Sequence, residues 1–140
     1  MTNSRILIIE DDQIQADDLK YRLEQLGLPV DQISTEAQFR KRLGQADIKS
    51  FGLAIVDMML RWTDPAPEME PEPADVIEEG AYTAGLRCCR SLASKGVRCI
   101  IFTALSPNAI PRRPGDDFEI IHKGGDGYAT LLDSIKRLGR

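Results

Sequence analysis

Short runs of consecutive apolar residues alternate along the chain with segments whose apolar residues recur at helical spacing. Such mostly apolar runs cover residues 5–10, 51–57, 97–103 and 118–122, and Val30 to Ser34 is a candidate for a short second strand. Runs of this kind are typical of strands buried on both faces of a sheet. The segments of helical spacing cover residues 13–27, 80–96 and 127–139 and a stretch that begins after Thr35. This order predicts an α/β fold, a doubly wound parallel sheet with helices on both faces.

The length and composition are those of one globular domain. The 140 residues are 42% hydrophobic and 29% charged, which suits a single core, so we expect one domain over residues 1–140. No apolar run has the roughly 18 residues of a membrane helix, and the N-terminus does not read as a signal peptide. We therefore expect a cytoplasmic protein with no membrane contact. The formal net charge of −4 gives no reason to expect nucleic acid as a partner.

Residues 62–78 form an acidic, proline-rich interruption. Between Trp62 and Leu86 there are seven acidic residues and no Lys or Arg, and four of the eight prolines also lie there. Such a composition buries too little apolar surface to offset the entropy of ordering, so we expect an extended, mobile acidic loop. It is either a solvated insertion without a role or a segment that docks a partner or covers a site. Trp62 either anchors the loop over that site or only covers apolar surface.

Polar residues stand where four of the predicted strands end. They are Glu10 and Asp11 after the first strand, Asp57 after the third, Thr103 after the fourth and Lys123 after the fifth. Ligands of open parallel sheets bind outside the carboxyl ends of the strands, so these residues are expected at one rim. Crowded carboxylates resist ionisation unless a cation lies between them, and oxygen ligands suit Mg²⁺. The next residue, Asp12, is better explained as the cap of the following helix.

The same set of residues suits phosphoryl transfer. A carboxylate such as Asp57 can accept a phosphoryl group as an acyl phosphate. Lys123 would neutralise a phosphate oxygen, and the Thr103 hydroxyl could donate a hydrogen bond to another. Phosphoryl transfer depends mainly on positioning and charge neutralisation, and these residues supply both.

The chain resembles the receiver domains of response regulators in two-component signalling. The matching segments are Ile-Leu-Ile-Ile-Glu-Asp-Asp at 6–12, Ala-Ile-Val-Asp-Met-Met-Leu at 54–60, Ile-Ile-Phe-Thr-Ala at 100–104 and Ile-Ile-His-Lys at 120–123. The resemblance covers nearly the whole chain except the acidic segment. It implies a flavodoxin-like, five-stranded parallel sheet in the order 2-1-3-4-5.

The resemblance also implies a role for each rim residue. Glu10 and Asp11 would be the acidic pair that holds Mg²⁺, together with Asp57 and the backbone carbonyl of Met59. Asp57 would be the phosphoacceptor. Two further residues would contact the phosphoryl group: Thr103 as the switch hydroxyl and Lys123 as its ion-pair partner.

The function implied is that of a stand-alone receiver. A histidine kinase or phosphotransfer protein would donate the phosphoryl group to Asp57 in an Mg²⁺-dependent step, and the aspartyl phosphate would switch a protein–protein contact. The output would pass through a downstream protein partner, a homodimer or a phosphorelay. We expect no enzymatic activity beyond self-phosphorylation and self-dephosphorylation.

Three departures from the family pattern keep alternatives open. Ile120 stands where the family usually has an aromatic residue, and Gly124 stands where it usually has proline. Three prolines follow Thr103, so the family's fourth helix, between the fourth and fifth strands, is expected to be short or absent. One alternative is therefore a pseudo-receiver that binds proteins with phosphorylation weak or lost. A further alternative is an Mg²⁺-dependent phosphohydrolase with Asp57 as nucleophile.

Overall fold

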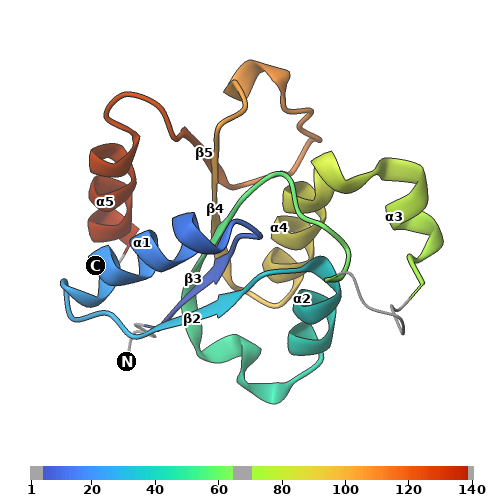
Figure 1. Cartoon of the computed structure of the whole chain (residues 1–140), viewed down its shortest axis with the longest axis horizontal. Coiled ribbons are helices and arrows are strands. Elements are labelled where there is room, and N and C mark those ends of the chain that lie inside the picture. Colours follow the sequence, from blue (N-terminus) through green and yellow to red (C-terminus); the bar gives the residue numbers. More distant parts are fainter. Residues whose placement is uncertain (1–4, 65–70, 139–140) are drawn as a thin grey trace.

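One parallel sheet of five strands forms the centre of the molecule (Figure 1). The computed structural model describes residues 5–64 and 71–138. The strands are β1 (Arg5–Ile9), β2 (Val30–Ile33), β3 (Phe51–Val56), β4 (Arg98–Thr103) and β5 (Glu119–His122). Their order in the sheet is β2-β1-β3-β4-β5, with every neighbouring pair parallel. The predicted fold class and strand order are confirmed.

Helices cover both faces of this sheet, with α1 and α5 on one side and α2 and α4 on the other (Figure 1). The α-helices are α1 (Gln13–Glu24), α2 (Glu36–Leu43), α3 (Ala74–Glu79), α4 (Ala84–Ser94) and α5 (Gly127–Leu138). Three 3₁₀ turns are η1 (Ala46–Ser50), η2 (Ala81–Thr83) and η3 (Pro107–Ala109). Within residues 5–64 and 71–138, none of these helices has the length and apolar character that crossing a membrane requires.

Two apolar layers account for the continuous apolar runs of the strands. Successive side chains of a strand point to opposite faces of the sheet. On β1, Leu7 packs into the layer under α2 and α4, whereas its neighbour Ile8 packs into the layer under α1 and α5. Both side chains are almost fully buried. A strand covered on both faces needs apolar residues at every position, which is what the sequence shows.

Only the 3₁₀ turn η3 occupies the chain between β4 and β5 in place of a regular helix. The prediction that this helix is short or absent is confirmed. Proline stands at the first position of η3, and the two later prolines also disfavour a longer helix. The segment is held instead by side chains: Arg90 of α4 forms a 3.0 Å ion pair with Asp116, and Arg112 donates to the carbonyl of Phe118.

The prediction of an extended acidic loop over residues 62–78 is wrong from Ala74 onward. Residues 65–70 lie outside the described residues. From Ala74 the segment is not extended but forms the helix α3, which ends at Glu79. The helix predicted for residues 80–96 begins only at Ala84, because Gly80 has a φ of +88°, which breaks the helical path.

Tertiary contacts explain why α3 forms in spite of its charge. Pro73 caps its beginning with a φ of −63°, which suits the start of a helix. Val76 is buried and packs against the buried Trp62. Asp75 forms a 2.7 Å ion pair with Arg40 of α2. Trp62 therefore does act as an anchor, but it attaches the acidic segment to α2.

Candidate functional site

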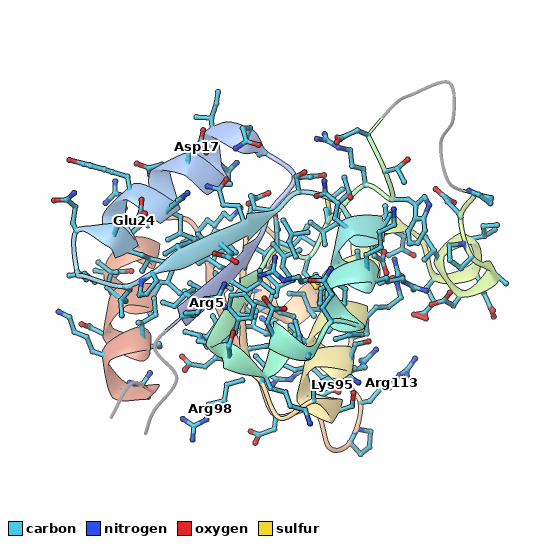
Figure 2. All side chains as sticks on the ribbon, turned by 90° about the horizontal axis from the view of Figure 1, so that it is seen from below. Arg5, Asp17, Glu24, Lys95, Arg98 and Arg113 are labelled. Atoms are coloured by element: carbon cyan, nitrogen blue, oxygen red, sulfur yellow. The ribbon has the colours of Figure 1, made fainter. Side chains whose placement is uncertain are left out.

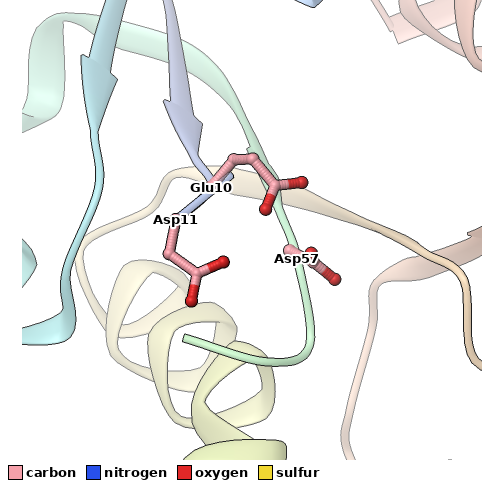
Figure 3. Close-up of side chains that lie close together, drawn as sticks. All are labelled: Glu10, Asp11 and Asp57. Carbon is pink, nitrogen blue, oxygen red and sulfur yellow. The ribbon is translucent and has the colours of Figure 1, made fainter. Parts of the chain in front are cut away.

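Three carboxylates meet at the carboxyl ends of β1 and β3. Ile9 and Val56 are register partners in the sheet, so the residues that follow them leave the sheet side by side. Glu10 and Asp11 follow β1, and Asp57 follows β3. Each offers a carboxylate oxygen, and these oxygens all lie within 4.8 Å of one another (Figure 3). The predicted acidic cluster is present.

Lys123, directly after β5, reaches into this cluster. Its Nζ donates to Glu10 Oε1 at 2.6 Å and to Asp57 Oδ2 at 3.2 Å. It also donates to Gln15 Oε1 at 2.5 Å. Bonds between an ammonium and carboxylates are among the stronger hydrogen bonds of proteins. Residues more than a hundred positions apart in the sequence thus form one charged network with Asp57 inside it.

The electrostatics of the network fit a site for a cation. The pKa of Glu10 is raised to about 7 as the net result of three main effects: burial raises it most, the hydrogen bond from Lys123 lowers it, and the charge of Asp57 raises it. Burial alone would lower the pKa of Lys123, but its bond to Glu10 and the charge of Asp57 outweigh burial and raise it. The carboxylates thus carry more negative charge than one ammonium relieves. Oxygen ligands with excess negative charge are the kind that Mg²⁺ takes.

Of the two further predicted metal ligands, Asp11 belongs to the acidic cluster, whereas the role of Met59 stays a prediction. Asp11 Oδ2 accepts a hydrogen bond from the backbone N–H of Arg61 at 3.2 Å. Met59 follows Asp57 by two residues and is half exposed. The role of its backbone carbonyl stays a prediction, because no contact of that carbonyl within the described residues shows it.

Thr103 lies at the same rim and is bonded to Lys123 through its backbone, whereas its hydroxyl bonds to Leu105. It is 1% exposed, and its Oγ1 accepts a hydrogen bond from the N–H of Leu105 at 3.2 Å. Its backbone carbonyl accepts from the N–H of Lys123 at 2.8 Å. The hydroxyl thus accepts a hydrogen bond from the chain that follows it.

Two residues beside the network clarify the beginning of α1. Asp12 accepts hydrogen bonds from the N–H groups of Ile14 and Gln15 and is the cap of the helix, as predicted. These bonds, from Gln15 first, lower the pKa of the Asp12 carboxyl. Sequence reasoning did not find Gln15, the third partner of Lys123, because nothing in the sequence marks a glutamine in a first helical turn as a partner of a lysine 108 residues away.

Sequence reasoning also did not find Gly85, which packs against the backbone of Asp57 and Met58. A Cβ at Gly85 would lie 2.5 Å from the carbonyl oxygen of Asp57 and 2.7 Å from the Cα of Met58. The N–H of Gly85 donates to the carbonyl of Met58 at 2.9 Å. Only a glycine lets α4 approach the Asp57 loop this closely.

His122 connects the two loops that follow β4 and β5. Its Nε2 lies 3.0 Å from the carbonyl oxygen of Ala104, and its Nδ1 accepts from the N–H of Gly124 at 2.9 Å. The side chain is exposed and points away from the site of Lys123, as the alternation of a strand requires.

Comparison with known proteins gives a clear result for structures and none for sequences. No family model and no curated protein matches the sequence. Many solved structures do match the fold, among them the response regulator TrrA of Thermotoga maritima in complex with Mg²⁺ and beryllium fluoride. It is 20% identical, with 99% of both chains covered and a TM-score of 0.66. This chain has the receiver-domain fold.

Two other receiver structures agree over similar lengths. The signal receiver domain of a histidine kinase from Syntrophus aciditrophicus is 25% identical over 96% of this chain and 89% of its own, with a TM-score of 0.66. The activated, beryllium fluoride form of SdrG from Pseudomonas melonis is 22% identical over 96% of this chain and 97% of its own, with a TM-score of 0.62. The receiver resemblance that was drawn from the sequence is thus confirmed for the fold.

Proposed function

We propose that this protein is a phosphorylation-dependent receiver whose phosphoacceptor is Asp57. The observation that carries the proposal is the convergence of Glu10, Asp11, Asp57 and Lys123 from the ends of three strands. A fold alone supports many functions, so the proposal depends on this constellation. Several structural neighbours are named as complexes with beryllium fluoride, which supports the same chemistry here.

The residues would divide the chemistry between them. A carboxylate oxygen of Asp57 attacks the phosphorus of the donor, the bond from phosphorus to the donor breaks, and the donor keeps the electron pair. Glu10 and Asp11, with Asp57, would hold Mg²⁺, which supplies positive charge for the phosphate oxygens. Lys123 already donates to Asp57 Oδ2 and would pair with a phosphoryl oxygen. Water later cleaves the acyl phosphate and restores the carboxylate.

The phosphoryl donor would be a histidine kinase or a phosphotransfer protein in the cytoplasm. Asp57 is partly exposed and its side chain is accessible to a donor. The signal would leave through a contact with a downstream protein partner.

One observation favours the pseudo-receiver as a second candidate. The Thr103 hydroxyl is turned toward Leu105, and Ile120 offers no aromatic ring that could move with it. In this second reading the network of Lys123 is a fixed structural element, and the protein binds its partner without a phosphoryl group.

Intact-protein mass spectrometry after incubation with acetyl phosphate separates the two candidates. We expect an Mg²⁺-dependent gain of one phosphoryl group, absent in Asp57→Asn. The control variant is Asp133→Asn, which changes an exposed carboxylate of α5 and should leave the gain intact. A native protein that binds Mg²⁺ but gains no mass would contradict the proposal and favour the pseudo-receiver.

A further inference from the structure

The helix α3 and the turn η2 expose two large apolar side chains. Ile77 is 67% exposed and Tyr82 is 62% exposed. Gly80, one helical turn after Ile77, lies against the Tyr82 ring, since a Cβ at Gly80 would come within 3.1 Å of Tyr82 Cε1. The Tyr82 ring therefore lies against the end of the helix that carries Ile77, and exposed apolar side chains that lie close together mark surfaces for partners.

Acidic side chains flank this apolar pair. Glu72 and Glu78 are exposed, and within the described residues neither has an ion-pair partner. The other two acids of this stretch differ, because Asp75 pairs with Arg40 at 2.7 Å and Glu79 lies 3.8 Å from Arg87. We call the four outward residues the insertion surface; they are Glu72, Ile77, Glu78 and Tyr82.

The segment that carries the insertion surface is anchored to α2 by a small buried cluster, which we call the anchor cluster. Val76 and Trp62 are buried together with Ala37 of α2. The N–H of Leu60 donates to the carbonyl of Ala81 at 3.2 Å, so the two ends of the insertion meet. A preformed surface loses less entropy when it binds than a disordered one does.

The residue that precedes Trp62 of this anchor cluster, Arg61, is bonded to the candidate phosphorylation site. Arg61 donates its N–H to the Asp11 carboxylate at 3.2 Å. Its carbonyl accepts from the N–H of Glu36 at 3.0 Å, and the carbonyl of Trp62 accepts from the N–H of Ala37 at 2.9 Å. A change in what the Asp11 carboxylate binds therefore acts directly on the residue that precedes the Trp62 anchor.

We propose that the insertion surface docks a basic amphipathic helix of a partner protein. The apolar face of that helix would cover Ile77 and Tyr82, and its Lys or Arg residues would pair with Glu72 and Glu78. Charge complementarity identifies the partner, since no Lys or Arg occurs between Trp62 and Leu86 and opposite charge both steers and selects a partner. The docking surface stands by itself, whereas its control by a phosphoryl group rests on the proposed function.

The surface is tested with a fluorescent helical peptide that carries leucine on one face and lysine on the other. Its Kd for the native protein is measured by fluorescence anisotropy, beside a peptide with glutamate in place of lysine. The test variant is Ile77→Ser/Glu78→Lys. The matched control is Leu26→Ser/Glu24→Lys, which makes the same two changes at exposed positions near the end of α1.

We expect the lysine peptide to bind and the glutamate peptide not to bind. The Kd should rise about tenfold in the test variant and by less than about twofold in the control. Circular dichroism of both variants verifies that they are folded. Equal weakening in both variants would show attraction to overall charge only and would overturn the proposal, as would a native protein that binds neither peptide.

A second arm repeats the titration after acetyl phosphate treatment. We expect the Kd of the phosphorylated protein to differ by at least about threefold from that of the untreated protein, and Asp57→Asn to show no difference. If phosphorylation occurs but the Kd does not change, the link between site and surface is overturned. If no phosphoryl group is gained, the proposed function fails, while the first arm still decides the docking surface.

Discussion

The candidate phosphorylation site has two sides: the insertion side, which is the chain from Asp57 to α4, and the side of β4 and β5. The two sides differ in their hydrogen bonds. On the insertion side, the chain after Asp57 is bonded through its backbone to its surroundings: Arg61 to the Asp11 carboxylate, Leu60 to Ala81 and Met58 to Gly85. These bonds connect the site to η2 and α4, and the carbonyls of Arg61 and Trp62 add bonds to α2. Movement at Asp57 cannot leave this side unaffected.

On the side of β4 and β5, Lys123 bonds to Glu10 and Asp57, but the loop that follows β4 makes more local bonds. The Thr103 hydroxyl bonds to Leu105, two residues further on. Ile120 is only partly buried and packs on the core as an ordinary aliphatic residue. A three-residue turn takes the place of a helix. The comparison teaches that, in this chain, the loop after Asp57 is bonded to distant segments, whereas the loop after Thr103 is bonded mainly to itself.

The ion pairs on the two sides differ in burial, and this difference gives the largest expected effect. Arg87 bonds to Glu36 at 2.7 Å with both side chains buried, whereas Arg90 pairs with the less enclosed Asp116. Arg87→Met would leave the buried Glu36 carboxylate with only the half-buried Arg40. We expect a loss of about 3 kcal/mol in the free energy of unfolding, since removing one partner of a buried pair leaves an uncompensated charge.

Urea unfolding of Arg87→Met and Arg90→Met measures that difference. We expect Arg90→Met to lose only about 1 kcal/mol, because its pair is partly solvated. Equal losses of unfolding free energy in the two variants would contradict the view that the ion pair on the insertion side contributes more to stability.

The close packing under Asp57 gives an intermediate effect. In Gly85→Ala the new methyl group would meet backbone atoms of Asp57 and Met58, the nearest at 2.5 Å, so one of the two segments must shift. We expect a loss of about 2 kcal/mol of stability and slower phosphorylation by acetyl phosphate, because the Asp57 carboxylate moves. Mass spectrometry over a time course measures the rate.

Gly44→Ala is the matched control for this glycine. Its nearest atom would be a backbone oxygen at 3.6 Å, which is an ordinary contact. Stability and phosphorylation rate should stay near those of the native protein. A native rate in Gly85→Ala would show that the approach of α4 does not position Asp57.

The exposed pair of α3 gives the smallest effect. Asp75 pairs with Arg40 at 2.7 Å, but its side chain is half exposed. We expect Asp75→Asn to cost about 0.5 kcal/mol, because exposed ion pairs contribute little, and to cost less at high salt. Thermal unfolding at low and high salt measures this. A loss as large as that of Arg87→Met would mean that α3 holds the insertion side together.

The features that sequence could predict are those that depend on local pattern. The apolar run ending in Glu10 and Asp11, the run ending in Asp57, and the position of Lys123 each follow from one short segment and the rule for parallel sheets. The absence of a helix after β4 follows from three prolines. These residues needed no knowledge of the rest of the chain.

The features that sequence could not predict depend on distant partners. The helix α3 has few apolar residues and forms because Val76 meets Trp62, a contact that overrides the composition of the segment. The bond from Glu36 to Arg87 spans 51 residues, and no pattern within either helix indicates it. Figure 2 labels charged side chains on several elements, among them Arg5, Asp17 and Arg98, so a charged residue by itself does not reveal which partner it has.

The most direct test compares backbone NMR shifts of the two sides when Mg²⁺ and beryllium fluoride, a phosphoryl mimic, are added. We predict larger shifts for the N–H groups of Arg61, Trp62 and α3 than for those of Leu105 and η3, and none of these shifts in Asp57→Asn. Larger shifts at Leu105 and η3, with α3 unmoved, would contradict the account, because the signal would then leave the site through β4 and β5.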